Sequence, residues 1–324
     1  MSSRGSSHGS VSTAADFGEE RGPGPAAREG TGIPPNGFRL PGSTRLGPVV
    51  LQISDLERSL EYYREVLGLQ LLGQDGRTAS LGTLGGEPLV ELRERRGIRP
   101  RPATSRTGLF HFALLLPDRA SLGRFARHLQ REGIAAGAAD HLVSEALYLR
   151  DPDHLGIEVY ADRPRGAWQQ VGSELVMVTD PLDMASVLAA AGDEPWRGMP
   201  TGSVMGHVHL SVGDLALASE FYSEGLGFDL RVWSYPGALF LAAGGYHHHL
   251  GTNVWAGRDA RPPAEDEAQL LEWTLELPAA EDMKAVAKSL AETGRSFDRV
   301  GTDRSDSILA RDPWGTAVRV TGGR

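Results

Sequence analysis

The sequence contains no cysteine among its 324 residues. This absence excludes disulfide bonds, thiolate nucleophiles and cysteine-ligated zinc. No apolar run approaches the roughly 18 residues of a membrane-spanning helix, and the N-terminus lacks the apolar core of a secretory signal. Lys and Arg (33) are outnumbered by Asp and Glu (42), so the chain has no basic excess that would attract nucleic acid or an anionic membrane. We therefore expect a cytoplasmic protein that binds neither.

The first 44 residues are rich in Ser, Gly, Pro and Ala and show neither helical nor strand periodicity. Such a segment buries too little apolar surface to offset the entropy of ordering it. We predict a disordered tail over residues 1–44 that carries none of the chemistry.

The rest of the chain contains a repeat. Residues 206–212 read Gly-His-Val-His-Leu-Ser-Val, and residues 47–53 read Gly-Pro-Val-Val-Leu-Gln-Ile. Each run alternates like a strand and leads into a helical pattern that starts after an aspartate, Asp214 or Asp55, and stops at a glycine. Short strand patterns follow, so the order is β-α-β-β-β.

A second pair of segments repeats in the same order. Pro117 corresponds to Pro278, and the turn Asp151-Pro152 corresponds to Asp312-Pro313. Four βαβββ modules predict an α+β fold with two similar domains. The predicted parts are residues 45–163 for an N-terminal domain of modules one and two, 164–199 for a connector, and 200–324 for a C-terminal domain of modules three and four.

Repeats share core positions, so a polar residue found in one copy alone points to function. Three residues that could bind a metal occur in one copy each. His207 corresponds to Pro48, His111 to Glu272, and Glu158 to Arg319.

Strand alternation gives these residues a direction. His111 should face away from Phe110 and Phe112, and Glu158 away from its apolar neighbours. If the first strands of modules two and three lie side by side, two imidazoles and one carboxylate converge. Such a set leaves adjacent positions open on the ion and suits Fe(II), with Mn(II) as an alternative. We predict a metal site formed by His111, Glu158 and His207.

The modules and these motifs resemble the vicinal oxygen chelate superfamily, and within it the extradiol ring-cleaving catechol 2,3-dioxygenases. Gly206-His207 and His111-Phe112 resemble the family's histidine ligand motifs, and the segment from Asp151 to Glu158 resembles the turn and strand that supply its carboxylate. The resemblance covers roughly residues 45–322.

Further site residues are implied by the resemblance. Tyr148 matches the family's active-site tyrosine, and His141 lies in a segment resembling the polar loop before it. His248 or His249 matches the histidine that faces dioxygen and acts as an acid-base group. His209 lacks a matching motif position, so we expect it to be a hydrogen-bonded core residue.

The activity implied is Fe(II)-dependent cleavage of a catechol-type ring by dioxygen to a hydroxymuconic semialdehyde, by a homo-oligomeric enzyme. Three alternatives stay open, because fold alone does not fix chemistry. The first is a glyoxalase-like isomerase or lyase, which would need a second carboxylate near Asn253-Val254-Trp255, where the sequence has none. The others are ring cleavage of a hydroquinone, which would use the same residues, and metal-free binding.

Overall fold

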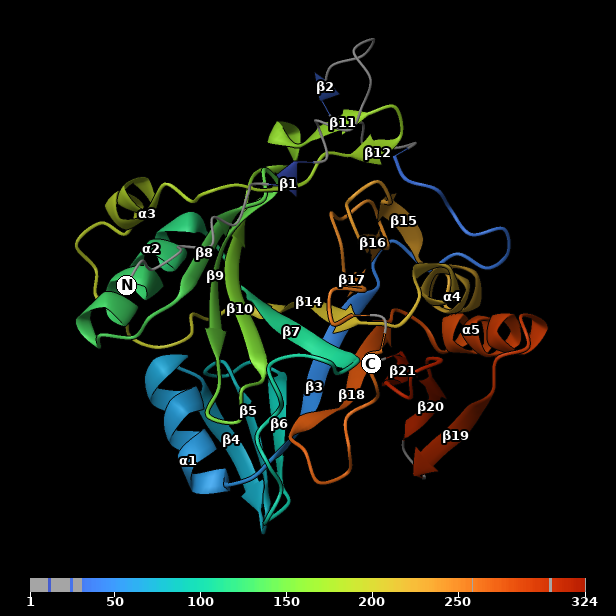
Figure 1. Cartoon of the computed structure of the whole chain (residues 1–324), viewed down its shortest axis with the longest axis horizontal. Helices are drawn as coiled ribbons and strands as arrows, with labels where there is room; N and C mark the ends of the chain where they lie inside the picture. The colour runs from blue at the N-terminus through green and yellow to red at the C-terminus, as the bar shows by residue number, and fades with distance from the viewer. Residues whose placement is uncertain (1–10, 13–23, 26–30, 258, 303–304, 324) are drawn as a thin grey trace, which may run out of the picture.

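The structure is a computed structural model that describes residues 11–12, 24–25, 31–257, 259–302 and 305–323. Its elements follow the four-module order (Figure 1). Module one comprises β3 (Arg45–Ile53), α1 (Leu56–Glu61) with a π-helical continuation (Tyr62–Val66), β4 (Gln70–Asp75), β5 (Thr78–Gly82) and β6 (Pro88–Glu94). Module two comprises β7 (Gly108–Leu115), α2 (Arg119–Arg131), β8 (Gly137–Asp140), β9 (Ser144–Arg150) and β10 (Gly156–Asp162).

The second half repeats this order after a connector. The connector contains a 3-10 turn (Arg165–Ala167), β11 (Gln169–Val171), β12 (Glu174–Leu175), β13 (Val178–Thr179) and α3 (Met184–Ala190). Module three comprises β14 (Val204–Ser211), α4 (Leu215–Ser219) with a π-helical continuation (Glu220–Gly225), β15 (Asp229–Val232), β16 (Ala238–Ala242) and β17 (Leu250–Asn253). Module four comprises β18 (Gln269–Leu277), α5 (Ala280–Glu292), β19 (Phe297–Thr302), β20 (Ser305–Arg311) and β21 (Ala317–Gly322). Four βαβββ modules and the α+β class are thereby confirmed.

Each of the two eight-stranded sheets joins one module that precedes the connector to one module that follows it. One sheet has the order β15-β16-β17-β14-β7-β10-β9-β8, which joins module three to module two. The other has the order β19-β20-β21-β18-β3-β6-β5-β4, which joins module four to module one. The first strands of modules two and three, β7 and β14, pair antiparallel at the centre of their sheet (Figure 1). This is the arrangement that the metal-site prediction requires, while the domain boundaries stay a prediction.

A buried hydrogen bond links the two sheets, and it occurs twice. The hydroxyl of Tyr63, in the helix of module one, donates to Asp151 in the turn of module two at 3.1 Å. The hydroxyl of Tyr222 in module three donates to Asp312 in module four at 2.8 Å. Both tyrosine side chains are fully buried. The repeat is therefore preserved in the contacts between sheets, and both tyrosines are helix-core residues.

Residues 31–44 pack against module three. Arg39 forms an ion pair with Asp229 at 2.7 Å, the guanidinium of Arg231 donates to Thr31, and Leu40 is buried. The prediction of a disordered tail is therefore wrong for residues 31–44, whose polar contacts and buried leucine offset the cost of ordering them. Residues 11–12 and 24–25 form the short strands β1 and β2, and the rest of that prediction lies outside the described residues.

The helices of the structure are short or amphipathic. Within the described ranges, none combines the length and the apolar character that crossing a bilayer requires.

Candidate metal centre and its cavity

Three buried side chains from three neighbouring strands converge on one point. Oε2 of Glu158, on β10, lies 3.0 Å from Nε2 of His111 on β7 and 3.1 Å from Nε2 of His207 on β14. The two imidazole Nε2 atoms are 3.3 Å apart. The sheet order β14-β7-β10 brings these residues together although they span 96 positions of sequence.

The spacing and charge of this group fit a metal ion. Ligand atoms bound at about 2.1 Å on adjacent octahedral positions lie about 3 Å from one another. Burial lowers the pKa of His207 to about 4, so at neutral pH its ring can present a lone pair. Burial acts to raise the pKa of Glu158, but the adjacent His207 and His111 outweigh it and hold that pKa well below its usual range. The group therefore offers two imidazoles and one carboxylate to a cation.

The corresponding positions of the other sheet hold an ion pair. The guanidinium of Arg319 donates to both carboxylate oxygens of Glu272, at 2.7 and 2.8 Å. Glu272 occupies the position of His111, and Arg319 the position of Glu158. In module one, Pro48 replaces His207. The second sheet thus has a salt bridge at the positions where the first sheet has candidate metal ligands.

Two β-bulges shape the site where β7 meets β14. His209 pairs with His111, and Leu210 pairs with Leu109, so Phe110 is an extra residue on β7. Phe110 consequently lines the same cavity as His111. The prediction that these two residues face opposite ways is wrong, because strict alternation fails at a bulge.

The second bulge lies at Gly206 on β14, the residue before His207. A Cβ atom at this position would overlap the hydroxyl of the buried Tyr160. Glycine at this position therefore leaves room for Tyr160 beside the candidate ligand His207.

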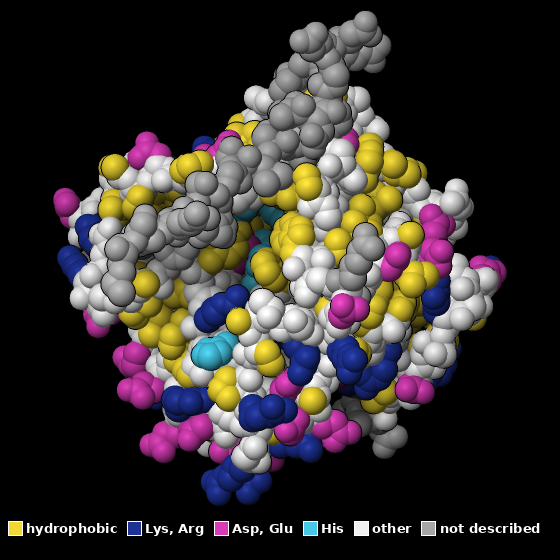
Figure 2. All heavy atoms as spheres, in the orientation of Figure 1, with side chains coloured by type: hydrophobic (Ala, Val, Ile, Leu, Met, Phe, Trp, Pro, Cys, Tyr) yellow, Lys and Arg dark blue, Asp and Glu magenta, His cyan; other side chains and the backbone are white. Residues whose placement is uncertain are grey.

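A cavity of about 480 Å³ opens over the three candidate ligands. Aromatic and aliphatic side chains form most of its wall, as is common for sites that bind small molecules. Figure 2 shows a hollow near the middle of the face, in which histidine side chains are visible between hydrophobic ones. Besides the ligands, the lining residues are Phe110, His141, Tyr148, Met177, Val178, Thr179, His209, Tyr235, Phe240, His248 and Trp255.

Tyr148 and His141 form a hydrogen-bonded pair in this cavity. The Tyr148 hydroxyl lies 2.6 Å from Nε2 of His141, whose Nδ1 lies 2.6 Å from the carbonyl oxygen of Val178. A carbonyl can only accept, so Nδ1 carries the proton of a neutral His141 and Nε2 accepts from Tyr148. Burial, together with the nearby Glu158, raises the pKa of Tyr148 well above its ordinary value. Tyr148 is therefore a protonated donor beside the candidate metal centre.

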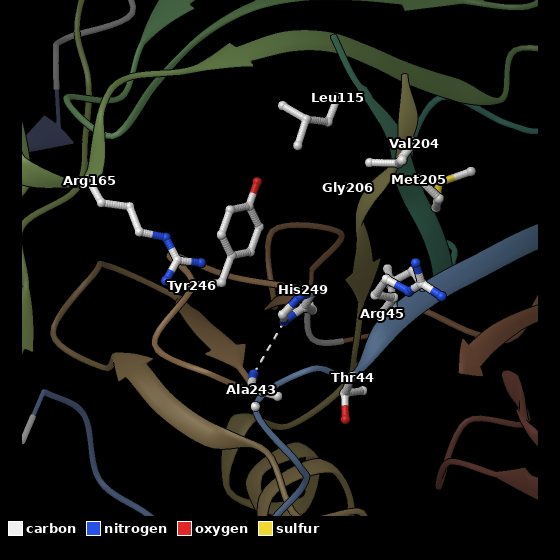
Figure 3. A pocket seen from close by; sticks show the side chains of 12 residues that line it. Thr44, Arg45, Leu115, Arg165, Val204, Met205, Gly206, Ala243, Tyr246 and His249 are labelled. Carbon is white, nitrogen blue, oxygen red and sulfur yellow. Dashed lines mark hydrogen bonds between the residues drawn. The ribbon is translucent and has the colours of Figure 1, made fainter. Parts of the chain in front are cut away.

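The structure separates the two histidines that the sequence could not. His248 lines the cavity, and its ring centroid lies 4.1 Å from that of His207. His249 instead lines a different cavity of about 210 Å³ with Arg165, Tyr246 and the start of β14 (Figure 3). Its Nδ1 accepts from the backbone N–H of Ala243 at 3.2 Å, as the dashed line in Figure 3 marks. Burial lowers the pKa of the His248 ring well below its ordinary value. Burial also lowers the pKa of the His249 ring, to about 3.

His209 departs from the core role expected of it. It is buried, lines the cavity and lies with its ring centroid 5.0 Å from that of His111. Among the described residues, nothing forms a hydrogen bond with its Nε2. His209 and His207 lie two residues apart on β14, so strand alternation directs both side chains to the same face of the sheet.

Connector residues were missed by sequence reasoning. Met177, Val178 and Thr179 close one side of the cavity, and Val178 orients His141. The signal available was a short apolar run, Leu175 to Val178, in a segment treated as a linker.

The chain is similar to known proteins of one superfamily. The family model described as Glyoxalase/Bleomycin resistance protein/Dioxygenase superfamily matches residues 45–159 and 204–320. The catechol-2,3-dioxygenase of Bacillus subtilis (strain 168) is 44% identical over 273 residues, which are 83% of this chain and 94% of that protein. Among solved structures, a proposed dioxygenase from Bacillus subtilis has a TM-score of 0.60 at 11% identity, covering 88% of this chain and 86% of that one. Glyoxalase I from Zea mays has a TM-score of 0.53 at 20% identity, covering 86% and 92%. At these identities the two structures support the fold alone.

Proposed function

Because the chain belongs to the Glyoxalase/Bleomycin resistance protein/Dioxygenase superfamily and is an enzyme of the extradiol dioxygenase type, we propose that it cleaves the ring of a catechol-type substrate with dioxygen. The product would be a hydroxymuconic semialdehyde. The observation that carries the proposal is the convergence of His111, Glu158 and His207 beneath an apolar cavity.

The proposed cofactor is Fe(II). His111, Glu158 and His207 would hold it through their Nε2 and Oε2 atoms, and Mn(II) is the alternative with the same ligand preference. When bound, the metal would supply the electron transfer between an aromatic diol and dioxygen that protein side chains cannot perform.

The protein's own residues would bind and orient the diol and control its protons. Phe110, Phe240 and Trp255 offer aromatic faces to the ring of the substrate. Tyr148 would donate a hydrogen bond to a substrate oxygen, and His141 would hold the Tyr148 hydroxyl in place. His248 would accept a proton from the substrate and return one to the product. Burial lowers the pKa of its ring and keeps the ring neutral, so one ring nitrogen has a free lone pair.

The isomerase alternative lacks one ligand. A glyoxalase-like site would take a second carboxylate from the last strand of module three. That strand, β17, reads Leu-Gly-Thr-Asn and contains no Asp or Glu. The dioxygenase proposal needs no further carboxylate and is therefore favoured.

Oxygen uptake tests the proposal. Protein purified anaerobically and supplied with Fe(II) should consume dioxygen when catechol is added and form a yellow ring-opened product, and His207→Ala should do neither. Uptake with hydroquinone but not with catechol would assign the other ring-cleavage reaction. A metal-loaded protein that consumes dioxygen with neither diol would contradict the proposal.

A further inference from the structure

We propose that Asp162 and His247 are positioning residues for His248, which they hold as the tautomer with a proton on Nδ1 and a lone pair on Nε2 toward the cavity. The inference rests on the proposed function, in which His248 accepts a proton from the substrate. Neither Asp162 nor His247 lines the metal cavity itself.

Two short hydrogen bonds connect the three residues. Nδ1 of His248 lies 2.7 Å from Nδ1 of His247, and Nε2 of His247 lies 2.8 Å from Oδ1 of Asp162. The side chain of His247 is fully buried, whereas that of Asp162, at the end of β10, is 27% exposed. The connection therefore runs from the buried cavity to a carboxylate in contact with solvent.

The chemistry of the three groups determines where each proton lies. An ionised carboxylate only accepts, so Nε2 of His247 carries a proton and donates it to Asp162. A neutral His247 then has a lone pair on Nδ1, and the bond between the two rings requires Nδ1 of His248 to donate. This assignment leaves Nε2 of His248 without a proton, on the edge of the ring opposite His247.

A second contact holds the carboxylate in place. The Tyr246 hydroxyl donates to Oδ1 of Asp162 at 3.2 Å and lies 2.7 Å from the hydroxyl of Tyr160. Tyr246 also lines the smaller cavity of Figure 3, beside Arg165. Asp162 is therefore oriented by two donors, Tyr246 and His247.

The tautomer would make His248 a base with an exit for the proton it accepts. A hydroxyl proton of the substrate binds Nε2 of His248 while the Nδ1 proton passes to Nδ1 of His247. The Nε2 proton of His247 then passes to Asp162. Each ring gains one proton and loses one, so neither becomes charged, and no oxidant or reductant takes part. The reverse sequence would return a proton to the product.

The other sheet supports a functional reading of these residues. Strand pairing aligns Leu250 with Val90, which places Pro88 at the position of His248, and it aligns Val318 with Ile157, which places Gly323 at the position of Asp162. Neither Pro88 nor Gly323 has a side chain that can form a hydrogen bond. The two ends of the connection, His248 and Asp162, therefore accompany the candidate metal ligands and have no polar counterpart in the other sheet, where Glu87 stands at the position of His247.

Nuclear magnetic resonance of ¹⁵N-histidine-labelled full-length protein tests the assignment directly, because a protonated and an unprotonated imidazole nitrogen have different ¹⁵N shifts. The spectra are recorded as purified and after loading with diamagnetic zinc, and the His248 signals are identified by their loss in His248→Gln. The expected result is a protonated Nδ1 and an unprotonated Nε2. A protonated Nε2 in the wild type would overturn the proposal.

Asp162→Leu removes the acceptor and puts an apolar side chain in its place. Asp229→Asn is the control, since it removes a buried carboxylate of the same sheet that contacts Arg39 and not the histidines. In Asp162→Leu the two ¹⁵N signals of His248 should move toward each other, and kcat for catechol should fall about 10- to 100-fold with KM little changed. Asp229→Asn should keep the wild-type shifts and kcat. Unchanged His248 shifts in Asp162→Leu would overturn the proposal. The shifts require no turnover, so they decide this inference even if the ring-cleavage activity is not found.

Discussion

Oε2 of Glu158 lies 3.1 Å from Nε2 of His207, although the two residues belong to different modules on either side of the connector. The contact exists because β14 pairs with β7, and β7 pairs in parallel with β10. Neither half of the chain contains all three candidate ligands. The site therefore depends on the pairing of modules two and three, and the remaining sheet keeps the same architecture with a salt bridge in place of the ligands.

The two adjacent histidines of the candidate acid-base motif should differ sharply in function. His248→Gln should lower kcat about 100-fold or more, because its ring lines the metal cavity. His249→Gln should keep kcat within about twofold, because its ring lines the separate cavity of Figure 3. Steady-state dioxygen uptake measures both, and equal losses in the two variants would contradict the assignment.

Tyr148 should act as a hydrogen-bond donor. Tyr148→Phe removes the hydroxyl that lies 2.6 Å from His141 and should lower kcat/KM about 10- to 100-fold, while the metal content stays that of the wild type. Tyr63→Phe is the matched control, since it removes a buried hydroxyl outside the cavity. Loss of metal in Tyr148→Phe would mean that the tyrosine maintains the ligand geometry instead.

Trp255 should limit the size of the substrate. Its side chain is 47% exposed and lines the cavity, where its ring lies 5.6 Å from that of Phe110. Trp255→Ala should raise KM for catechol about 3- to 10-fold and should favour catechols with bulky substituents, because the cavity becomes larger. A substrate series measures this change. A parallel loss for every substrate, without a size trend, would contradict it.

The buried Asp151 should make stability depend on pH. Burial raises its pKa to about 7, so between about pH 4 and pH 7 the folded chain keeps a proton that the unfolded chain has lost. The free energy of unfolding contributed by this group should therefore fall as the pH rises through that window, by up to about 1.4 kcal/mol per pH unit. Asn can replace the protonated acid, because its oxygen can accept from the N–H groups of Asp153 and Leu155.

Urea denaturation of the wild type and Asp151→Asn between pH 4 and pH 8 measures this effect. The difference in stability between the two proteins should change in favour of the variant as the pH rises. A difference that does not vary with pH would contradict the raised pKa.

Much of the architecture could be predicted from the sequence, because the repeat supplied an internal comparison. The helix starts at Asp55 and Asp214 follow from the capping preference of aspartate, and both side chains accept from a backbone N–H three residues on. The three candidate ligands could be recognised because their counterparts are Pro48, Glu272 and Arg319. Core residues are shared between copies, so such differences mark positions that the fold itself does not require.

Other features could not be predicted because they depend on long-range geometry. Phe110 was assigned to the wrong face, since a bulge forms only when two strands are paired in a particular register. His248 and His249 could not be told apart, because the segment between β16 and β17 is not a regular strand. The tail was placed entirely outside the fold, although Arg39 contacts Asp229 across 190 residues of sequence.

Metal content measured beside a matched variant of the other sheet tests the central claim most directly. Glu158→Gln removes the candidate carboxylate ligand, and Glu272→Gln neutralises the glutamate that bonds Arg319 within module four of the other sheet. After anaerobic purification and addition of Fe(II), the wild type and Glu272→Gln should each hold about one iron per chain, and Glu158→Gln should hold almost none. Iron retained by Glu158→Gln, or no iron in the wild type, would contradict a metal centre built from modules two and three.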